Sequence, residues 1–248
     1  MTIKFLGTGT STGIPQIGCN CQTCVSSDKK DKRLRASVLF EIEHQKILID
    51  AGPDLRQQFL NFQIQHIDAI LITHEHYDHI GGIDDIRPLG HTIIYGEKRV
   101  LNTIKTNMPY CFSENKYPGV PLIELTEIQD KEFIVNNIHI EPIRVMHAKL
   151  PILGFRIGNA AYLTDVKTID NESISKLQNL DVLIINALRH TEHISHLSLS
   201  ESLELIRKTQ PKQTFLTHLS HDMGQHEKIQ LTLPQNVNIA YDNLILNI

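Results

Sequence analysis

Short apolar runs bounded by turn residues recur along the chain, and they predict a protein rich in β-strands. The predicted strands are Ile3–Leu6, Ser37–Ile42, Lys46–Ile49, Ala69–Thr73, Thr92–Tyr95, Leu122–Leu125, Ile138–Val145, Ile152–Ile157, Ala160–Thr164, Val182–Ile185, Gln213–Thr217 and Leu244–Leu246. Helical patterns lie between some of them, over Pro53–Asn61, Ile83–Leu89, Lys98–Thr106, Asn171–Leu177, Leu199–Thr209 and Asp222–Gln230. Asp54 and the segment Ser198–Ser200 are suited to begin helices.

The order of these elements predicts the fold class. Strands joined by hairpins come first, strand–helix alternation follows, and the second half of the chain repeats the theme. This order predicts an α/β protein in which two sheets pack face to face with helices outside, a four-layer α/β/β/α sandwich. Residues 1–248 contain no linker, repeat or shift of composition, so we expect a single domain.

Composition and charge narrow the class of protein. The hydrophobic share of 41% and the charged share of 21% predict a sizeable core rather than disorder. A net charge of −4 argues against a basic surface for nucleic acid, so a nucleic-acid partner is not expected. The N-terminus lacks a signal-peptide pattern, and no apolar run approaches the ~18 residues of a membrane helix. We therefore expect a cytoplasmic protein that does not enter a membrane.

The chain holds fourteen histidines, and several gather directly after the strand Ala69–Thr73. His74 and His76 are two residues apart in an extended turn, so both imidazoles can converge on one metal ion. Asp78 and His79 can offer a carboxylate and an imidazole to a second ion beside the first. This density of ligand side chains at a strand end indicates a metal site rather than a histidine-rich surface loop.

Later strands end in further ligand side chains. His147, Asp165 and His218 follow the strands that begin at Ile138, Ala160 and Gln213. They complete two predicted ligand sets, in which His74, His76 and His147 bind one ion, Asp78, His79 and His218 bind the other, and Asp165 bridges them. Imidazole and carboxylate ligands suit zinc, manganese and iron, so the ligand types leave the metal undecided.

The motif His-x-His-x-Asp-His, with a His, an Asp and a His downstream, resembles the metallo-β-lactamase-fold hydrolases. The resemblance runs from Gly7-Thr-Gly to His218. The bridging Asp165 and the segment His196-Leu-Ser resemble the phosphodiesterase branch that includes ribonuclease Z. Within that branch, a cysteine-rich insertion and the segment Thr217-His-Leu-Ser-His221 resemble the PhnP-like proteins.

The resemblance implies a phosphodiesterase whose substrate is a small, cyclic phosphodiester such as a phosphoribosyl 1,2-cyclic phosphate. A hydroxide that bridges two divalent ions, zinc or manganese, would attack phosphorus, and Asp78 would bind an ion and orient that hydroxide. By the same resemblance His196 contacts the phosphate and protonates the leaving group, because an ordinary imidazole pKa near 6.5 suits a proton donor. The alternative for His196 is a structural residue at a helix start.

The cysteine insertion covers about residues 15–33 and offers Cys19, Cys21 and Cys24 as thiolate ligands. Three thiolates supply three corners of a tetrahedral, structural zinc site. The resemblance implies His221 as the fourth ligand. The residues themselves leave His226 and Cys111 as alternatives, or three reduced thiols without a metal.

Other functions compete with phosphodiester hydrolysis. A thioester or lactam hydrolase shares the fold, and a non-catalytic metal-binding carrier belongs to another class. Processing of tRNA is disfavoured, because the segment Asn107–Pro121, a lid or a small insertion, has one lysine and is too short for an RNA-binding arm. Arg189, His190 and His193 receive no role, and the tendency of relatives to dimerise makes a homodimer an alternative to a monomer.

Overall fold

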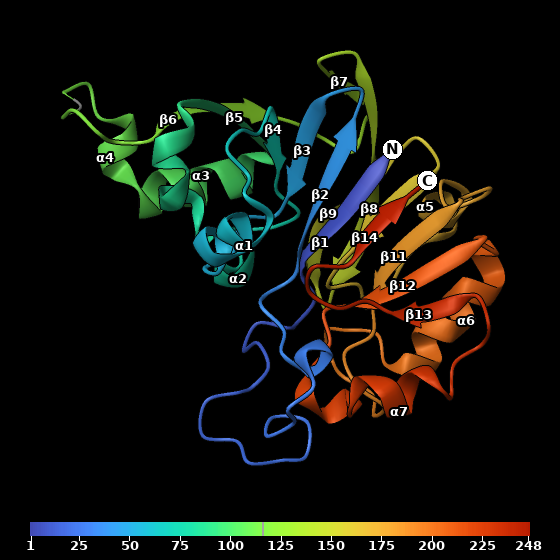
Figure 1. The fold of residues 1–248 in the computed structure, drawn as a ribbon. Helices are drawn as coiled ribbons and strands as arrows, with labels where there is room; N and C mark the ends of the chain where they lie inside the picture. Colours follow the sequence, from blue (N-terminus) through green and yellow to red (C-terminus); the bar gives the residue numbers. More distant parts are fainter. Residues whose placement is uncertain (116) are drawn as a thin grey trace.

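Two seven-stranded β-sheets form the centre of the molecule in the computed structural model, which describes residues 1–115 and 117–248 (Figure 1). The first sheet has the order β14-β1-β2-β3-β4-β5-β6 and the second β13-β12-β11-β10-β9-β8-β7. The strands of the first sheet are β1 (Thr2–Gly7), β2 (Ser37–Ile42), β3 (Gln45–Ile49), β4 (Ala69–Leu71), β5 (His91–Gly96), β6 (Leu122–Glu127) and β14 (Ile245–Asn247). Those of the second sheet are β7 (Phe133–Val135), β8 (Ile138–His147), β9 (Leu150–Ile157), β10 (Ala160–Leu163), β11 (Val182–Asn186), β12 (Gln213–Thr217) and β13 (Val237–Ile239).

Helices cover the outer face of each sheet. Over the first sheet lie α1 (Leu55–Phe62), α2 (Tyr77–Ile80), α3 (Lys98–Asn107), α4 (Pro109–Phe112) and the 3₁₀ helix η2 (Ile83–Leu89). The helices that pack on the second sheet are α5 (Asn171–Ser175), α6 (Leu199–Thr209), α7 (His226–Gln230) and the 3₁₀ helix η3 (His221–Met223). The predicted α/β/β/α sandwich is confirmed. Among the described residues, no helix is both long enough and apolar enough to span a membrane.

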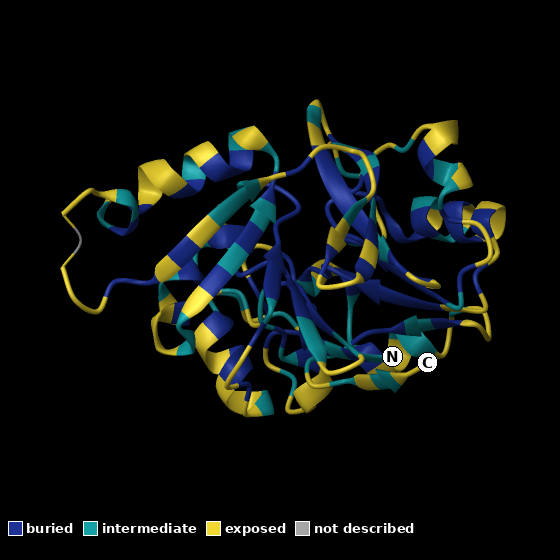
Figure 2. Ribbon diagram, turned by 90° about the horizontal axis from the view of Figure 1, so that it is seen from above, coloured by how far each residue is buried: buried dark blue, intermediate teal, exposed yellow. Residues whose placement is uncertain are grey.

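Three apolar layers hold the sandwich together. The layer between the sheets includes Phe5, Phe40, Phe155 and Tyr162, none of them exposed. The other two layers join each sheet to its helices, which turn buried faces inward and exposed faces outward (Figure 2). Each fully buried large side chain contributes about 1.5–3 kcal/mol, so the sheets form a rigid base for the loops at their ends.

Some elements differ from the sequence-based expectation. The short strands β7 and β13 and the short helices α2 and α4 were not expected. The predicted helix over Asp222–Gln230 is interrupted at Gly224, whose φ of 100° no helix accommodates. Pro88 lies inside the predicted helix over 83–89, and its missing N–H fits the 3₁₀ helix seen there.

The two expected helix starts also differ from each other. Ser198 begins α6 with a capping box in which Glu201 takes part. Asp54 occupies the residue before α1, but its carboxylate makes no capping hydrogen bond. It pairs instead with Arg35, whose guanidinium lies 2.9 Å away.

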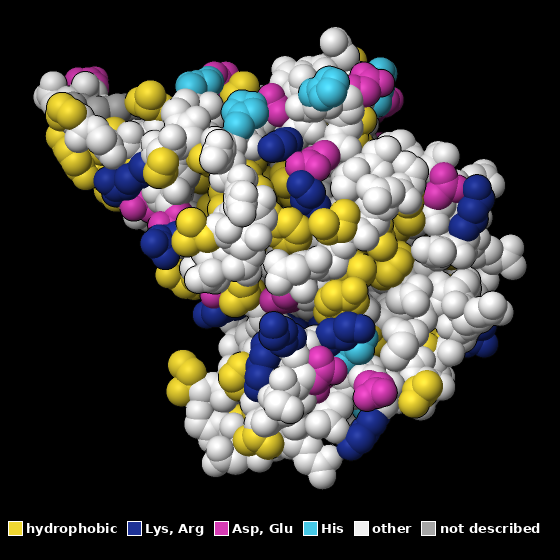
Figure 3. Space-filling model, in the orientation of Figure 1, with side chains coloured by type: hydrophobic (Ala, Val, Ile, Leu, Met, Phe, Trp, Pro, Cys, Tyr) yellow, Lys and Arg dark blue, Asp and Glu magenta, His cyan; other side chains and the backbone are white. Residues whose placement is uncertain are grey.

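The cysteine-containing segment, residues 10–36, hangs below the two sheets beside α7 (Figure 1). The Asp31 carboxylate accepts from the His226 amide at 2.7 Å, and the Asp242 carboxylate accepts from the Leu34 amide at 2.6 Å. Arg33 is buried and donates to the Thr8 hydroxyl at 2.7 Å. Lysine and arginine side chains gather where this segment joins the body (Figure 3). The segment is thus anchored through buried polar contacts.

Candidate metal centre

The predicted ligands come together at the carboxyl ends of four strands. His74 lies just beyond β4, His147 is the last residue of β8, and Asp165 and His218 follow β10 and β12. Because β8, β10 and β12 run in the same direction, their last residues meet at one edge of the second sheet. Asp165 and His218 have φ of 59° and 54°, so each turns the chain sharply where the strand ends.

The first group consists of His74, His76, His147 and Asp165, whose ligand atoms all lie within 4.8 Å of one another. His74 Nε2 and His76 Nδ1 are 3.0 Å apart. Two imidazole nitrogens that each bind a tetrahedral zinc at about 2.0–2.1 Å would be separated by a similar distance, about 3.3 Å. The spacing of this group therefore fits a single ion.

The second group consists of Asp78, His79, Asp165 and His218, again within 4.8 Å of one another. His79 Nε2 lies 3.2 Å from Asp78 Oδ2, and His218 Nε2 lies 3.6 Å from the same oxygen. The two imidazoles are fully or almost fully buried, and Asp78 is mostly buried. Two carboxylates and two imidazoles suit a divalent cation.

Asp165 belongs to both groups because its two oxygens face in different directions. Oδ2 lies 3.7 Å from His74 Nε2 in the first group. Oδ1 lies 3.1 Å from His218 Nε2 and 3.5 Å from His79 Nε2 in the second. This is the geometry that a bridging carboxylate requires.

Unpartnered ring nitrogens indicate that a cation fits here. His79 Nε2 and both ring nitrogens of His218 are buried without a hydrogen bond among the described residues. A buried polar atom without a partner costs about 1–3 kcal/mol, and a metal ion would remove that cost at the ligand nitrogens. Burial also holds the pKa of His74 well below its usual range, so its imidazole is neutral, as a ligand must be.

Asp50, a buried residue that the sequence analysis missed, orients two of these histidines. Its Oδ2 accepts a hydrogen bond from His79 Nδ1 at 2.7 Å, which turns His79 Nε2 toward the second group. The Thr73 hydroxyl donates to Asp50 and lies 2.9 Å from His74 Nδ1, which can donate to it. Such outer contacts fix the tautomer and the direction of a ligand histidine. Asp50 follows β3 directly, so the signal at the strand end was present in the sequence.

His147 is oriented in a similar way. Its Nδ1 lies 2.8 Å from the Ser195 carbonyl oxygen and 3.0 Å from that of Asp165. Nδ1 therefore carries the proton, and Nε2 is left for the first group.

His196 lies beside both groups without belonging to either. Its ring centroid is 4.6 Å from that of His147 and 4.9 Å from that of His218, and its Nδ1 is 4.0 Å from Asp165 Oδ2. Burial lowers the pKa of His196 to about 3, with His218 and His147 adding to the effect and Asp165 opposing it. The role expected for His196 relied on an ordinary imidazole pKa near 6.5, whereas the buried ring has a much lower pKa and is therefore a weaker base.

A third group, of sulfur ligands, lies in the cysteine-containing segment. It contains Cys19, Cys21, Cys24 and His221, and its ligand atoms lie within 4.8 Å of one another. His221 Nδ1 is 3.3 Å from Cys19 Sγ and 3.4 Å from Cys21 Sγ.

The two alternative fourth ligands lie elsewhere. His226 has Nδ1 at 3.5 Å from the Arg33 guanidinium, and its backbone amide donates to Asp31. Cys111 is buried in α4, among the residues that pack on the first sheet. Of the candidates, His221 is the one beside the thiols.

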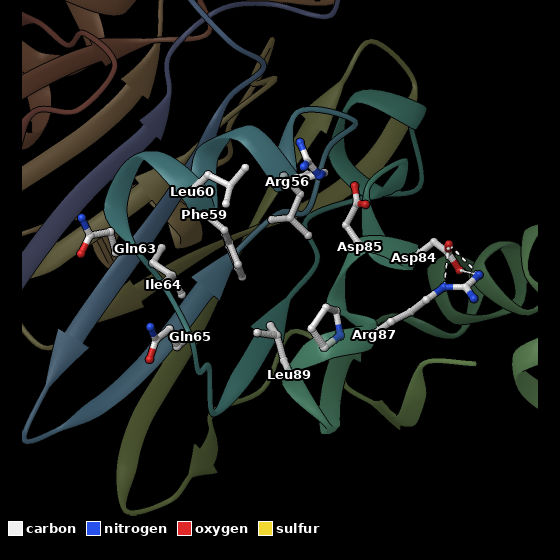
Figure 4. A pocket seen from close by; sticks show the side chains of 12 residues that line it. Arg56, Phe59, Leu60, Gln63, Ile64, Gln65, Asp84, Asp85, Arg87 and Leu89 are labelled. Carbon is white, nitrogen blue, oxygen red and sulfur yellow. Dashed lines mark hydrogen bonds and ion pairs between the residues drawn. The ribbon is translucent and has the colours of Figure 1, made fainter. Parts of the chain in front are cut away.

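A cavity of about 740 Å³ lies away from these groups, between α1 and η2 (Figure 4). Phe59, Leu60, Ile64 and Leu89 give it an apolar lining, with the ion pair of Asp84 and Arg87 at one end. None of its lining residues belongs to the three ligand groups.

Comparison with known proteins identifies the family. Residues 45–219 match the model of the β-lactamase superfamily domain. A crystal structure described as a new diphosphatase from the PhnP family superposes with a TM-score of 0.93 and 38% identity, over 99% of this chain and 96% of that one.

Two curated relatives match as well. A protein named octanoyltransferase from Porphyromonas gingivalis is 43% identical over 98% of this chain and 51% of its own length. Ribonuclease Z from Bacillus thuringiensis is 30% identical over 63% of this chain and 49% of its own length. The chain therefore spans about half the length of these curated relatives. Because the superfamily model covers most of the chain, and the PhnP-family structure matches nearly all of it, this chain belongs to the PhnP family within the β-lactamase superfamily.

Proposed function

We propose that the chain is a phosphodiesterase that uses two divalent metal ions, zinc or manganese. The observation that carries the proposal is the position of Asp165, whose two oxygens face two separate ligand groups. His74, His76 and His147 would hold one ion with Asp165, and Asp78, His79 and His218 would hold the other. When bound, two such ions act as Lewis acids that activate water and stabilise the charge developing on a phosphoryl group.

The side chains around the ions would position the substrate and move protons. The Asp78 carboxylate is 13% exposed, so it can bind an ion and still accept a hydrogen bond from the attacking water. His196 is neutral before substrate binds. An anionic phosphate next to its ring would raise the pKa of His196, and the imidazole could then protonate the leaving oxygen.

We also propose that Cys19, Cys21, Cys24 and His221 bind one structural zinc. A set of four protein ligands leaves no open coordination position for water, which is the pattern of a structural site. Cys19, Cys21 and Cys24 form no disulfide, and a reducing compartment such as the cytoplasm keeps cysteines in that state. The cytoplasm is therefore the location that we propose.

Hydrolysis of a diphosphate is the second candidate function. It is favoured by the PhnP-family relative described as a diphosphatase, which matches this chain over nearly its whole length. A diphosphate diester and a phosphodiester both present phosphorus with two bridging oxygens, so one site can serve either. Octanoyl transfer is not proposed for this chain, because about half of the relative that bears that name lies outside the match.

The test is an assay of the metal-loaded protein on a panel of substrates. The panel contains bis(p-nitrophenyl) phosphate, a 2′,3′-cyclic nucleotide, a dinucleoside diphosphate, a chromogenic lactam and an acyl thioester. We expect turnover of one or more phosphorus substrates and a fall of about 10²–10⁴-fold in His196→Ala, the range typical of a lost proton donor. The turnover of Asp78→Ala should fall at least as far, while the turnover of His190→Ala should equal that of the wild type. Preference for the lactam or the thioester, or near-normal turnover in both active-site variants, would contradict the proposal.

A further inference from the structure

A row of imidazole rings leads outward from the metal centre. His147 and His218 contact His196, and the ring of His196 lies 5.2 Å from that of His193 at an interplanar angle of 35°. His196 is buried and His193 is half-buried, so His193 lies at the solvent-facing end of the row. His193 has no role in the predictions from the sequence or in the mechanism proposed above.

The hydrogen bonds of His193 determine which nitrogen can contact a ligand. Its Nδ1 accepts from the Ser195 backbone amide at 3.3 Å and lies 3.2 Å from the Ser195 hydroxyl. Burial lowers the pKa of His193, and the positive charge of Arg189 lowers it further, so the ring is neutral. A neutral ring that accepts at Nδ1 carries its proton on Nε2, which makes Nε2 a hydrogen-bond donor.

The loop that carries His193 is braced at several points. The Arg189 guanidinium donates to the carbonyl oxygens of Thr191 and Glu192, at 3.4 Å and 3.1 Å. The Ser195 carbonyl oxygen lies 2.8 Å from His147 Nδ1, so the loop is tied directly to a proposed metal ligand. The loop therefore holds His193 at a fixed position relative to the ligand groups.

This position suits a contact with the leaving group. In the proposed function, on which this step rests, His196 acts on the bridging oxygen that departs from phosphorus. His193 is the next ring outward from His196, so it would lie beside the atoms attached to that oxygen. If those atoms belong to a second phosphoryl group, they present anionic oxygens to the Nε2 donor, and hydrogen bonds to charged groups are the stronger ones.

We propose that His193 is a substrate-binding residue whose Nε2 donates to a second phosphoryl group on the leaving side, so that the enzyme prefers diphosphate diesters to simple phosphodiesters.

Binding of product-like ligands tests the contact without any turnover. Isothermal titration calorimetry of metal-loaded protein would compare orthophosphate with methylenediphosphonate, which carries a second phosphoryl-like group. We expect His193→Ala to lower the affinity for methylenediphosphonate about tenfold, or 1.4 kcal/mol. The affinity for orthophosphate should fall less than about twofold. His193→Gln should recover part of the loss because its amide also offers an N–H, and His190→Ala, in the same loop, should bind like the wild type. An unchanged affinity ratio in His193→Ala overturns the proposal.

Kinetics separates this proposal from the proposed function. In His193→Ala, kcat/KM should fall about tenfold more for a dinucleoside diphosphate than for bis(p-nitrophenyl) phosphate, with unchanged metal content. Equal losses on the two substrates would make His193 a support of the metal centre and would overturn its assignment to the leaving group. If the wild type hydrolyses neither substrate, the proposed function fails, and the calorimetric ratio still decides the role of His193.

Discussion

Asp50→Asn should weaken metal binding while leaving the fold largely intact. Asp50 is completely buried and accepts hydrogen bonds from the Thr73 amide at 2.9 Å, from the Thr73 hydroxyl at 2.9 Å and from His79 Nδ1 at 2.7 Å. Asparagine keeps one carbonyl oxygen for Thr73 but turns an N–H₂ group toward the N–H of His79. His79 must then move its proton to Nε2, the nitrogen that faces the second ligand group, or turn away.

The magnitude follows from these contacts. Loss of an outer-shell partner of a ligand histidine typically lowers metal affinity about 10–100-fold. Asp50→Ala would instead leave three buried donors without a partner, each at a cost of about 1–3 kcal/mol. A sum of about 3–9 kcal/mol is comparable with the whole stability of a typical domain, so we expect the alanine variant to fold poorly. The asparagine variant therefore isolates the effect on metal.

The assay is competition between the protein and a chromophoric chelator, followed by thermal unfolding of the metal-free proteins. We expect Asp50→Asn to bind one ion about 10–100-fold more weakly than the wild type, with the loss centred on the group that contains His79. Asp54→Asn is the matched control, since Asp54 pairs with Arg35, which belongs to none of the ligand groups. Equal metal affinity in Asp50→Asn and wild type would refute this account of Asp50.

Three further predictions concern other parts of the chain. A Cβ at Gly52 would lie 2.1 Å from the Asp78 carbonyl oxygen, so Gly52→Ala should lower stability by about 1–3 kcal/mol in thermal unfolding and reduce bound metal. Hydrogen bonds from the Cys24 amide and then from His221 lower the pKa of Cys21 to about 6, whereas burial raises the pKa of Cys24 to about 11. In chelator-treated protein at neutral pH, iodoacetamide should therefore alkylate Cys21 before Cys24, which mass spectrometry would detect. Burial raises the pKa of Asp242 to about 6, so the folded state binds more protons between the unfolded value of 3.8 and pH 6, and stability falls as pH rises through that window. In the wild type, the free energy of unfolding should fall by about 3 kcal/mol in total over this pH range. Denaturant titrations of Asp242→Asn should show no such fall.

The grouping of the candidate ligands could be predicted because these residues lie at the ends of strands that the sequence displays. The strands stood out as apolar runs in the sequence. His147 ends one strand, and Asp165 and His218 lie within two residues of the ends of two others. Parallel strands in one sheet bring such residues to the same edge, so the convergence did not require knowledge of individual contacts. The short strands β7 and β13 escaped because three residues carry too little periodicity to stand out.

Properties that depend on tertiary contacts were not predictable. Asp50 follows a strand like the ligands do, but its role depends on β3 pairing with β4, which places Thr73 and His79 beside it. The low pKa of His196 likewise arises from burial among His147 and His218. Nothing in the segment His196-Leu-Ser reveals that environment, so an ordinary imidazole was the only basis for the sequence-based argument.

The backbone at the centre is held in sparsely populated conformations by the structure around it. Asp50, Asp165 and His218 all adopt left-handed conformations, with φ of 63°, 59° and 54°. A non-glycine residue in this region costs of order 1–3 kcal/mol and persists only when its surroundings enforce it. Here the surroundings are the two sheets and the hydrogen bonds that tie ligands to one another, such as that between His147 Nδ1 and the Asp165 carbonyl oxygen. The two sheets thus maintain these conformations, and a bound cation would remove the remaining cost at the unpartnered nitrogens of His79 and His218.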